Sequence, residues 1–280
     1  MFKSPLRYPG GKQKAIPQIA HYLPPTFKEF REPFVGGGAV FFHVLQKYPS
    51  MPCWVNDLNP ELYYFWHQVK INLPELVESV WKVKNQTTDG RALFKSLAAA
   101  DPSNMTPLER AVRFFVLNRI TFSGTIESGG YSGASFTGRF TDSSIERLAA
   151  LDGCFVNTSV TNFDYSTLLT EPGEDVFIFL DPPYLSKTQS KLYGKRGDLH
   201  TCFDHSRFAK LMSECSHKWL ITYDNCEQVQ HHFSFAYIYK WELQYGMNNY
   251  KQEKAEKGKE LFITNYPVES YNLHPIMEVV

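Results

Sequence analysis

The stretch "FIFLDPPYL" (177–185) decides the fold, because an apolar run ends there on an acid, two prolines and a tyrosine. Residues Val176 to Leu180 are typical of a buried strand. Asp181 follows at the carboxyl end of that strand, which is where open α/β sheets bind their ligands. The stretch therefore predicts an α/β protein with a polar site at this edge of its sheet.

The composition fits one large domain, or a domain that carries an insertion. Of 280 residues, 43% are hydrophobic and 15% aromatic, which excludes disordered and fibrous proteins. The longest apolar run (176–180) is too short to span a membrane, and "MFKSPLRYPGGK" at the start lacks the apolar stretch of a secretory signal. The five cysteines include no Cys-x-x-Cys pair, so we expect reduced thiols in a cytoplasmic protein without a zinc or disulfide framework.

Strand and helix patterns alternate at both ends of the chain. Residues 39–48 predict a helix that Pro49 ends, and Asn59 with Pro60 predicts the start of another helix. Further patterns predict strands at 53–58, 154–160, 176–180 and 218–224, and a terminal hairpin of 235–246 with 260–266. This order predicts a doubly wound, mostly parallel sheet with an antiparallel hairpin at its end.

The middle of the chain departs from that alternation. Residues 61–120 show helical patterns, and a segment rich in Gly, Ser and Thr follows them. We therefore expect residues 1–60 and 150–280 to form one α/β domain, with 61–149 as a mainly helical insertion.

A glycine-rich turn precedes the first of these helices. In "REPFVGGGAVFFHVL" (31–45), three glycines allow a ligand to approach the backbone at a helix N-terminus. Asp57 ends the next strand, 21 residues after Gly36, a separation at which an acid accepts hydrogen bonds from ribose hydroxyls in doubly wound folds. The pair favours a nucleoside-bearing cofactor over an ordinary turn with a capping aspartate. "YPGGK" (8–12) is not a phosphate loop; its turn either brings Lys12 to a carboxylate or is a solvated turn.

The "DPPY" motif (181–184) suits an amino group on a planar base. Pro182 and Pro183 contribute no N–H, which leaves carbonyl acceptors on a stiff backbone. Asp181 and the Pro182 carbonyl can accept the two amino hydrogens, while an exposed Tyr184 stacks on the ring. The alternative is a proline-rich turn after a buried strand.

Basic residues gather in two stretches although the net charge is zero. Residues 185–197 carry cations and no acid, and residues 110–140 carry four arginines against one glutamate. Each stretch is either a solvated surface or part of a nucleic-acid contact.

Together the motifs resemble the Dam-like, D12 class of DNA adenine-N6 methyltransferases over nearly the whole chain. They occur in the order of that class: "YPGGK" (8–12), "EPFVGGG" (32–38), "NDLN" (56–59), "DPPY" (181–184) and "ELFITNY" (260–266). Between them, "NRITFSG" (118–124) resembles the family's Asn-Arg-x-x-Phe/Tyr-Asn-Gly stretch, with Ser123 where Asn is usual. The interior of the segment that follows does not align with the family's Gly-Ala-Thr-Cys readers.

The resemblance implies S-adenosylmethionine as methyl donor and assigns roles by position. It gives Lys12 the cofactor carboxylate, Asp57 the ribose and Asp164 the cofactor adenine. The implied cofactor contacts are Tyr8, Gly10, Lys12, Phe34, Gly36, Gly38, Asp57, Asp164 and Asp181. The implied catalytic residues are Asp181, Pro182, Pro183 and Tyr184. The candidate DNA contacts are Arg119, Arg139, Lys187, Lys191, Lys195 and Arg196.

The resemblance predicts site-specific methyl transfer to N6 of an adenine that is flipped out of double-stranded DNA. No metal is needed, because the sulfonium is already a good leaving group. We expect a monomer in solution; its state on DNA, its target sequence and a partner restriction enzyme stay open. Cytosine-N4 methylation is the nearer alternative, although Asp before Pro-Pro favours adenine. Methylation of RNA or of a protein glutamine is a more distant activity, and a non-catalytic DNA-binding regulator belongs to a different class of function.

Overall fold

Seven strands form one sheet in the computed structural model, which describes residues 3–124, 126, 129–185, 203–243 and 258–268. The strands are β1 Glu29–Glu32, β2 Cys53–Asn56, β3 Thr158–Thr161, β4 Val176–Leu180, β5 Lys218–Asp224, β6 Tyr237–Leu243 and β7 Gly258–Thr264. Their order is β3-β2-β1-β4-β5-β7-β6. The first five pair in parallel, and β7 pairs antiparallel with both β5 and β6. The predicted sheet with a terminal antiparallel hairpin is confirmed.

Helices cover both faces of the sheet, as β4 shows by its alternation. Phe177 and Phe179 belong to the core on one face, with residues of α1 (Ile16–Tyr22), α2 (Ala39–Lys47) and α3 (Pro60–Ile71). Ile178 and Leu180 belong to the core on the other face, with residues of α9 (Tyr165–Thr170), α11 (His205–Glu214) and α12 (Glu227–His232). Every residue of β4 is buried, which explains why its sequence is a continuous apolar run.

The sequence pattern did not indicate β1, because charged residues make up most of it. Arg31 is buried, and its guanidinium donates to the carbonyl oxygens of Leu168 (2.9 Å), Glu171 (2.6 Å) and Pro172 (3.0 Å). Carbonyls at the end of a helix lack intrahelical partners, so this arginine satisfies the C-terminus of α9. Arg31, one of the charged residues that hide β1 from the sequence pattern, thus links β1 to α9.

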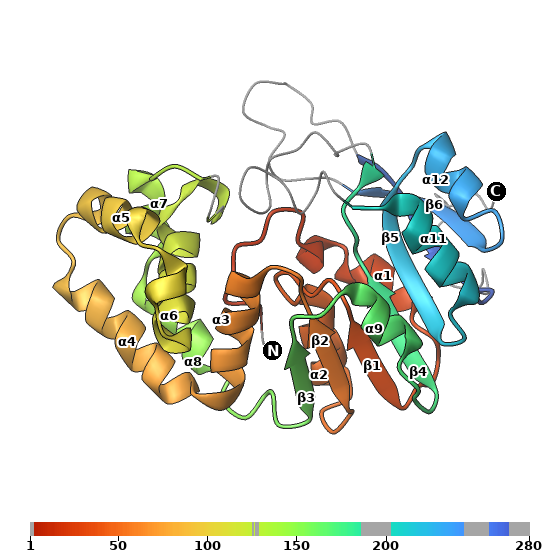
Figure 1. The fold of residues 1–280 in the computed structure, drawn as a ribbon, viewed down its shortest axis with the longest axis horizontal. Helices are drawn as coiled ribbons and strands as arrows, with labels where there is room; N and C mark the ends of the chain where they lie inside the picture. The colour runs from red at the N-terminus through yellow and green to blue at the C-terminus, as the bar shows by residue number, and fades with distance from the viewer. Residues whose placement is uncertain (1–2, 125, 127–128, 186–202, 244–257, 269–280) are drawn as a thin grey trace.

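Helices occupy the segment that the sequence assigns to an insertion. After α3 come α4 Leu73–Gln86, α5 Gly90–Ala99, α6 Pro107–Ile120, α7 Gly133–Arg139 and α8 Asp142–Ala149, which lie together beside the β3 edge of the sheet (Figure 1). This group has no separate core: Phe65 of α3 stacks on Phe114 and Phe115 of α6, and all three belong to the same cluster as the sheet. The helices therefore share one hydrophobic core with the α/β part.

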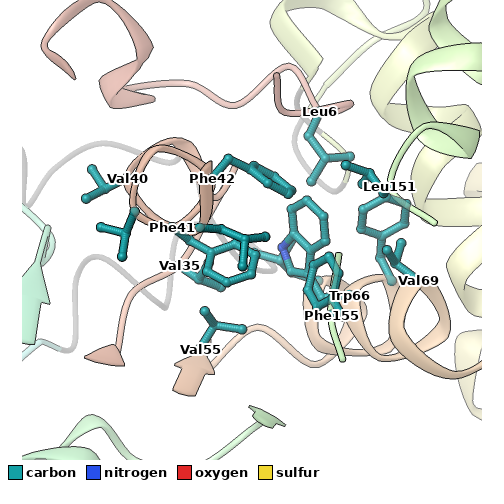
Figure 2. Packing of buried hydrophobic residues seen from close by; sticks show 14 of the residues in the cluster. Leu6, Val35, Val40, Phe41, Phe42, Val55, Trp66, Val69, Leu151 and Phe155 are labelled. Carbon is teal, nitrogen blue, oxygen red and sulfur yellow. The ribbon is translucent and has the colours of Figure 1, made fainter. Parts of the chain in front are cut away.

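The core also reaches the glycine-rich turn. Trp66 of α3 packs against Phe42 of α2 and against Phe155 (Figure 2). Its indole N–H donates to the carbonyl oxygen of Gly36 at 3.0 Å. The buried Trp66 side chain therefore fixes the position of the glycine-rich turn. In the part of the chain that the structure describes, no helix has the length and apolar character needed to cross a membrane.

Candidate active site

One pocket lies at the carboxyl ends of β1, β2 and β4. Its wall brings together segments that are far apart in the sequence, namely the "YPGGK", "EPFVGGG", "NDLN" and "DPPY" motifs. The lining residues are Tyr8 to Lys12, Glu32, Phe34 to Val40, Asp57 to Asn59, Phe179, Asp181 to Tyr184 and Phe203. Most of the residues predicted to bind cofactor or base therefore share a single site.

The glycine-rich turn is shaped by Tyr8 and Asp57. Gly36 has φ +47°, and a Cβ there would lie 2.8 Å from Cε1 of Tyr8, so only glycine fits. The Asp57 carboxylate accepts from the N–H of Gly36 and from the N–H of Asn59, both at 3.0 Å. The Asp57 side chain keeps some exposure to the pocket, yet burial raises its pKa to about 6, with these two hydrogen bonds acting in the opposite direction. Asp57 thus holds the turn closed and presents a carboxylate to the pocket.

Glu32 is a site residue that the sequence analysis missed. It ends β1, lines the pocket and is only 3% exposed. Burial raises its pKa well above the ordinary value, and the nearby Asp181 and Asp57 act in the same direction, against a hydrogen bond from the Phe41 N–H. Its Oε2 atom has no hydrogen-bond partner among the described residues. Glu32 is the first residue of the "EPFVGGG" motif. Its place at the end of a strand, beside the pocket, could not be inferred because the sequence pattern did not indicate β1.

Lys12 pairs with Asp181 across the pocket wall. Its Nζ atom lies 2.9 Å from Asp181 Oδ1, and the lysine is 5% exposed. The "YPGGK" turn therefore brings Lys12 to a carboxylate, as one of its two interpretations predicts, and the contact of Lys12 with the cofactor carboxylate stays a prediction. The Gly11 N–H bonds to the Tyr8 carbonyl and the 3-10 turn Lys12–Lys14 follows, which carries the Lys12 side chain toward the end of β4.

Tyr184 is buried, so the prediction of an exposed aromatic is wrong. It is 7% exposed, and its hydroxyl donates to Glu260 Oε2 of β7 at 2.9 Å. Its ring stacks on that of Tyr223, with centroids 6.0 Å apart, and Lys12 Nζ lies 5.0 Å from its centroid. Burial raises the pKa of Tyr184 well above its ordinary value, helped by Asp181 and Glu260. The ring is therefore a fixed part of the pocket wall.

Asp164 does not line the pocket. Its carboxylate caps α9 by accepting from the Ser166 N–H at 3.0 Å, and it pairs with Arg207 at 2.9 Å. The hydrogen bond from Arg207 is the main cause that lowers the pKa of Asp164 to about 2. Asp164 thus caps a helix and forms an ion pair, and its contact with the cofactor adenine stays a prediction.

Of the predicted DNA contacts, Arg119 is buried and Arg139 is exposed. Arg119 is 3% exposed, and its Nε and Nη2 atoms have no hydrogen-bond partner among the described residues. Burial lowers its pKa to about 9, and the charges of Arg147, Arg7 and Arg139 act in the same direction. Arg119 is therefore not a surface contact in this structure, contrary to the prediction. Lys187, Lys191, Lys195 and Arg196 lie outside the described residues.

Asn118 fastens the helical segment to the start of the site. Its side-chain oxygen accepts from the Arg7 N–H (2.9 Å), and its amide nitrogen donates to the carbonyl oxygens of Arg7 (2.7 Å) and Gly124 (3.0 Å). Residue Ser123 between them has φ +56°, a conformation that Asn adopts more readily than Ser. The departure from the family pattern at this position therefore falls on a strained turn.

We expect Asn118→Ala to lower the free energy of unfolding by about 2–4 kcal/mol, because it leaves several buried backbone groups without partners. Thermal unfolding monitored by circular dichroism measures the loss. Asn157 is exposed, and Asn157→Ala is the matched control, with an expected change within about 0.5 kcal/mol. Equal stability of the two variants would contradict the anchoring role of Asn118.

Comparison with known proteins gives the family of the chain. The model of the D12 class N6 adenine-specific DNA methyltransferases matches residues 8–247. The chain is 25% identical over 214 residues to the Type II methyltransferase M1.LlaDCHI of Lactococcus lactis subsp. cremoris, covering 72% of this chain and 70% of that protein. It is 27% identical over 205 residues to the Type II methyltransferase M.MjaIII of Methanocaldococcus jannaschii (66% of this chain, 71% of that protein).

A further relative is a DNA adenine methylase of Vibrio cholerae serotype O1, 24% identical over 188 residues, or 64% of each chain. The family match spans the four motifs that meet in the pocket. The chain therefore belongs to the D12 class of N6 adenine-specific DNA methyltransferases.

Proposed function

We propose that the pocket binds S-adenosylmethionine next to a receptor for the target adenine, which leaves the DNA duplex to reach it. The observation that carries this proposal is the meeting of Glu32, Asp57 and Asp181 in one pocket, at the ends of three neighbouring strands. Three carboxylates side by side are stabilised by cationic or hydrogen-donating ligands. An amino-acid ammonium, a ribose and an exocyclic amine are such ligands.

The residues present fit the cofactor. Glu32 Oε2, buried and without a partner among the described residues, suits the ammonium of the methionine part. Asp57 suits the ribose hydroxyls, and the backbone at Gly36 and Gly38 allows close approach because neither carries a Cβ. When bound, S-adenosylmethionine supplies an electrophilic methyl group on a sulfonium. The protein holds the two reactants in line, an effect that can contribute about 7–11 kcal/mol.

Asp181 to Tyr184 suit the target base. The exocyclic amine of adenine is a poor nucleophile because its lone pair is delocalised into the ring. Hydrogen bonds from N6 to the Asp181 carboxylate and the Pro182 carbonyl would localise that lone pair. As the bond from N6 to the methyl carbon forms, the bond from that carbon to sulfur would break, S-adenosylhomocysteine would leave, and the surplus N6 proton would pass to water. The base must leave the stack first, at a cost of a few kcal/mol. The buried Tyr184 borders the base site as a fixed part of its wall.

The face beside Tyr8 suits the DNA backbone. The charges of Arg7, Arg139 and Arg147 all lower the pKa of the buried Arg119, so three cations lie near a fourth there. A polyanion relieves such repulsion, and phosphates are the groups that position a protein on a duplex. Phe122, in the adjoining turn, is 71% exposed and offers a ring for stacking. We accordingly assign target recognition to the helical segment 61–149.

Arg139→Ala is expected to weaken DNA binding uniformly across sequences. Because one phosphate contact is lost, the slope of log K against log salt becomes less negative by about 0.9. Fluorescence anisotropy with a labelled duplex at several salt concentrations measures the slope. Lys210→Ala, at an exposed position of α11, is the matched control and leaves the slope unchanged. An unchanged slope in Arg139→Ala would remove Arg139 from the DNA face.

Incubation with labelled S-adenosylmethionine and unmethylated DNA, followed by nucleoside analysis and mapping, tests the proposed function. We expect N6-methyladenine at one recurrent sequence. N4-methylcytosine would replace the proposal by cytosine methylation, and modified RNA with unmodified DNA would replace it by RNA methylation. DNA binding with no modified nucleoside would indicate a non-catalytic regulator.

A further inference from the structure

We propose that Thr222 is a positioning residue for methyl transfer, which together with Lys12 holds Asp181 by Oδ1 so that Oδ2 receives the target amine. This inference rests on the proposed function of the pocket, because it concerns the same receptor. The family motifs quoted above do not include Thr222, and the pocket lining does not include it either. Thr222 acts through its hydrogen bond to Asp181, which does line the pocket.

Both donors to Asp181 use the same oxygen. The Thr222 hydroxyl donates to Oδ1 at 2.7 Å, and Lys12 Nζ lies 2.9 Å from Oδ1. Oδ2 accepts no hydrogen bond in the part of the chain that the structure describes, although Asp181 lines the pocket. The two oxygens therefore have different surroundings. One is anchored to the protein, and the other is available to a ligand.

Thr222 is well placed to act as an anchor, because the sheet fixes it. It is fully buried in β5, where the neighbouring Ile221 pairs with Leu180 of β4 and Thr222 itself pairs with Phe262 of β7. Its hydroxyl thus stands in a rigid position directly beside the residue that follows β4. Lys12, by contrast, reaches Asp181 at the end of a long side chain on a short 3-10 turn.

Thr222 also lies close to Tyr184. The Thr222 hydroxyl acts against the rise in the pKa of Tyr184, and the Tyr184 hydroxyl donates to Glu260 on β7. The residue that orients the Asp181 carboxylate is therefore also a neighbour of the tyrosine that ends the "DPPY" motif.

The expected consequence is a loss of rate without a loss of binding. When the hydroxyl is removed, the Asp181 carboxylate keeps Lys12 alone among these two partners and turns away from the orientation in which Oδ2 meets N6. Because methyl transfer needs the amine lone pair in line with the methyl group, small errors in orientation cost rate. The cofactor contacts at Glu32 and Asp57 are made by other elements and remain unchanged.

Thr222→Val and Thr222→Ser test the inference, because valine matches the shape of threonine and serine keeps its hydroxyl. We expect the single-turnover rate on a duplex carrying the mapped site to fall about 10- to 100-fold in Thr222→Val and less than about threefold in Thr222→Ser. Dissociation constants for S-adenosylmethionine, by calorimetry, and for DNA, by anisotropy, stay within about twofold of wild type in both. If Thr222→Val does not fold, Thr222→Ala against Thr222→Ser gives the same comparison of hydroxyl with no hydroxyl.

A wild-type rate in Thr222→Val would overturn the inference. Equal losses in the serine and the hydroxyl-free variants would overturn it too, because they would indicate packing alone. A rate loss matched by weaker cofactor binding would also overturn it. A wild-type protein that produces no N6-methyladenine would instead defeat the proposed function itself, so the two failures are distinct.

Discussion

Asp181→Asn is expected to lower the single-turnover rate of methyl transfer at least about a hundredfold, although asparagine and aspartate have nearly the same shape. Lys12 and Thr222 both donate to the Oδ1 position, so the amide oxygen occupies that place. The NH2 group then stands where Oδ2 was and faces the N6 hydrogens as a second donor. A hydrogen bond to a charged acceptor contributes about 1.5–3 kcal/mol, and here it is replaced by a repulsive contact.

The measurement is a rapid-quench single turnover with saturating cofactor and DNA, together with calorimetric binding of S-adenosylmethionine. We expect the dissociation constant of the cofactor to change little. The variant also leaves the buried Lys12 without a counter-charge, so circular dichroism must show that it is folded at the assay temperature. Asp152→Asn, at an exposed position, is the matched control. Asp181→Ala should abolish transfer, and a rate near wild type in either variant would contradict the assignment.

Glu32→Gln is expected to weaken S-adenosylmethionine binding by about tenfold or more while making the free protein more stable. The affinity falls because a buried carboxylate that pairs with an ammonium becomes a neutral amide, a loss of about 1.5–3 kcal/mol. The stability rises because the free protein no longer holds an ionisable group whose buried Oε2 has no partner among the described residues. Opposite signs in binding and stability separate this role from a purely structural one.

The stability effect depends on pH in a defined direction. The pKa of Glu32 is raised in the folded protein, so the folded state binds the proton more tightly than the unfolded state. Its contribution to stability is greatest below the ordinary value of 4.5 and is lost as pH rises above it. Asp57, with its pKa raised to about 6, acts in the same direction. Glu32→Gln is expected to remove the part of the pH dependence of stability that comes from Glu32. Wild-type affinity for S-adenosylmethionine, or lower stability of the variant, would contradict the role of Glu32.

The sequence predicts the fold well where local signals agree with burial. The bounds of β4 and β5 match the predicted strands, since β4 is a continuous apolar run and both strands are buried on both faces. The start of α3 matches as well, because the Asn59 side chain accepts from the N–H groups of Glu61 and Leu62 and so caps the helix. Such features depend on residues that are close in sequence, so the sequence pattern alone predicts them.

Other features depend on partners that are distant in sequence. Arg31 is buried in β1 because carbonyls of α9, more than a hundred residues later, receive it. Tyr184 is buried because Glu260 of β7 accepts from its hydroxyl, and Lys12 faces Asp181 because a turn near the start of the chain meets the end of β4. A motif therefore identifies which residues form the site, while the pairing between distant segments determines what each one does.

The most direct test is a crystal structure of the wild-type protein with S-adenosylhomocysteine and a duplex that carries the mapped site. We expect the target adenine outside the base stack, with N6 within hydrogen-bond distance of Asp181 Oδ2 and the Pro182 carbonyl, and with Oδ1 still held by Lys12 and Thr222. An adenine that remains stacked, or an N6 that contacts neither Asp181 nor Pro182, would contradict the assignment of this pocket.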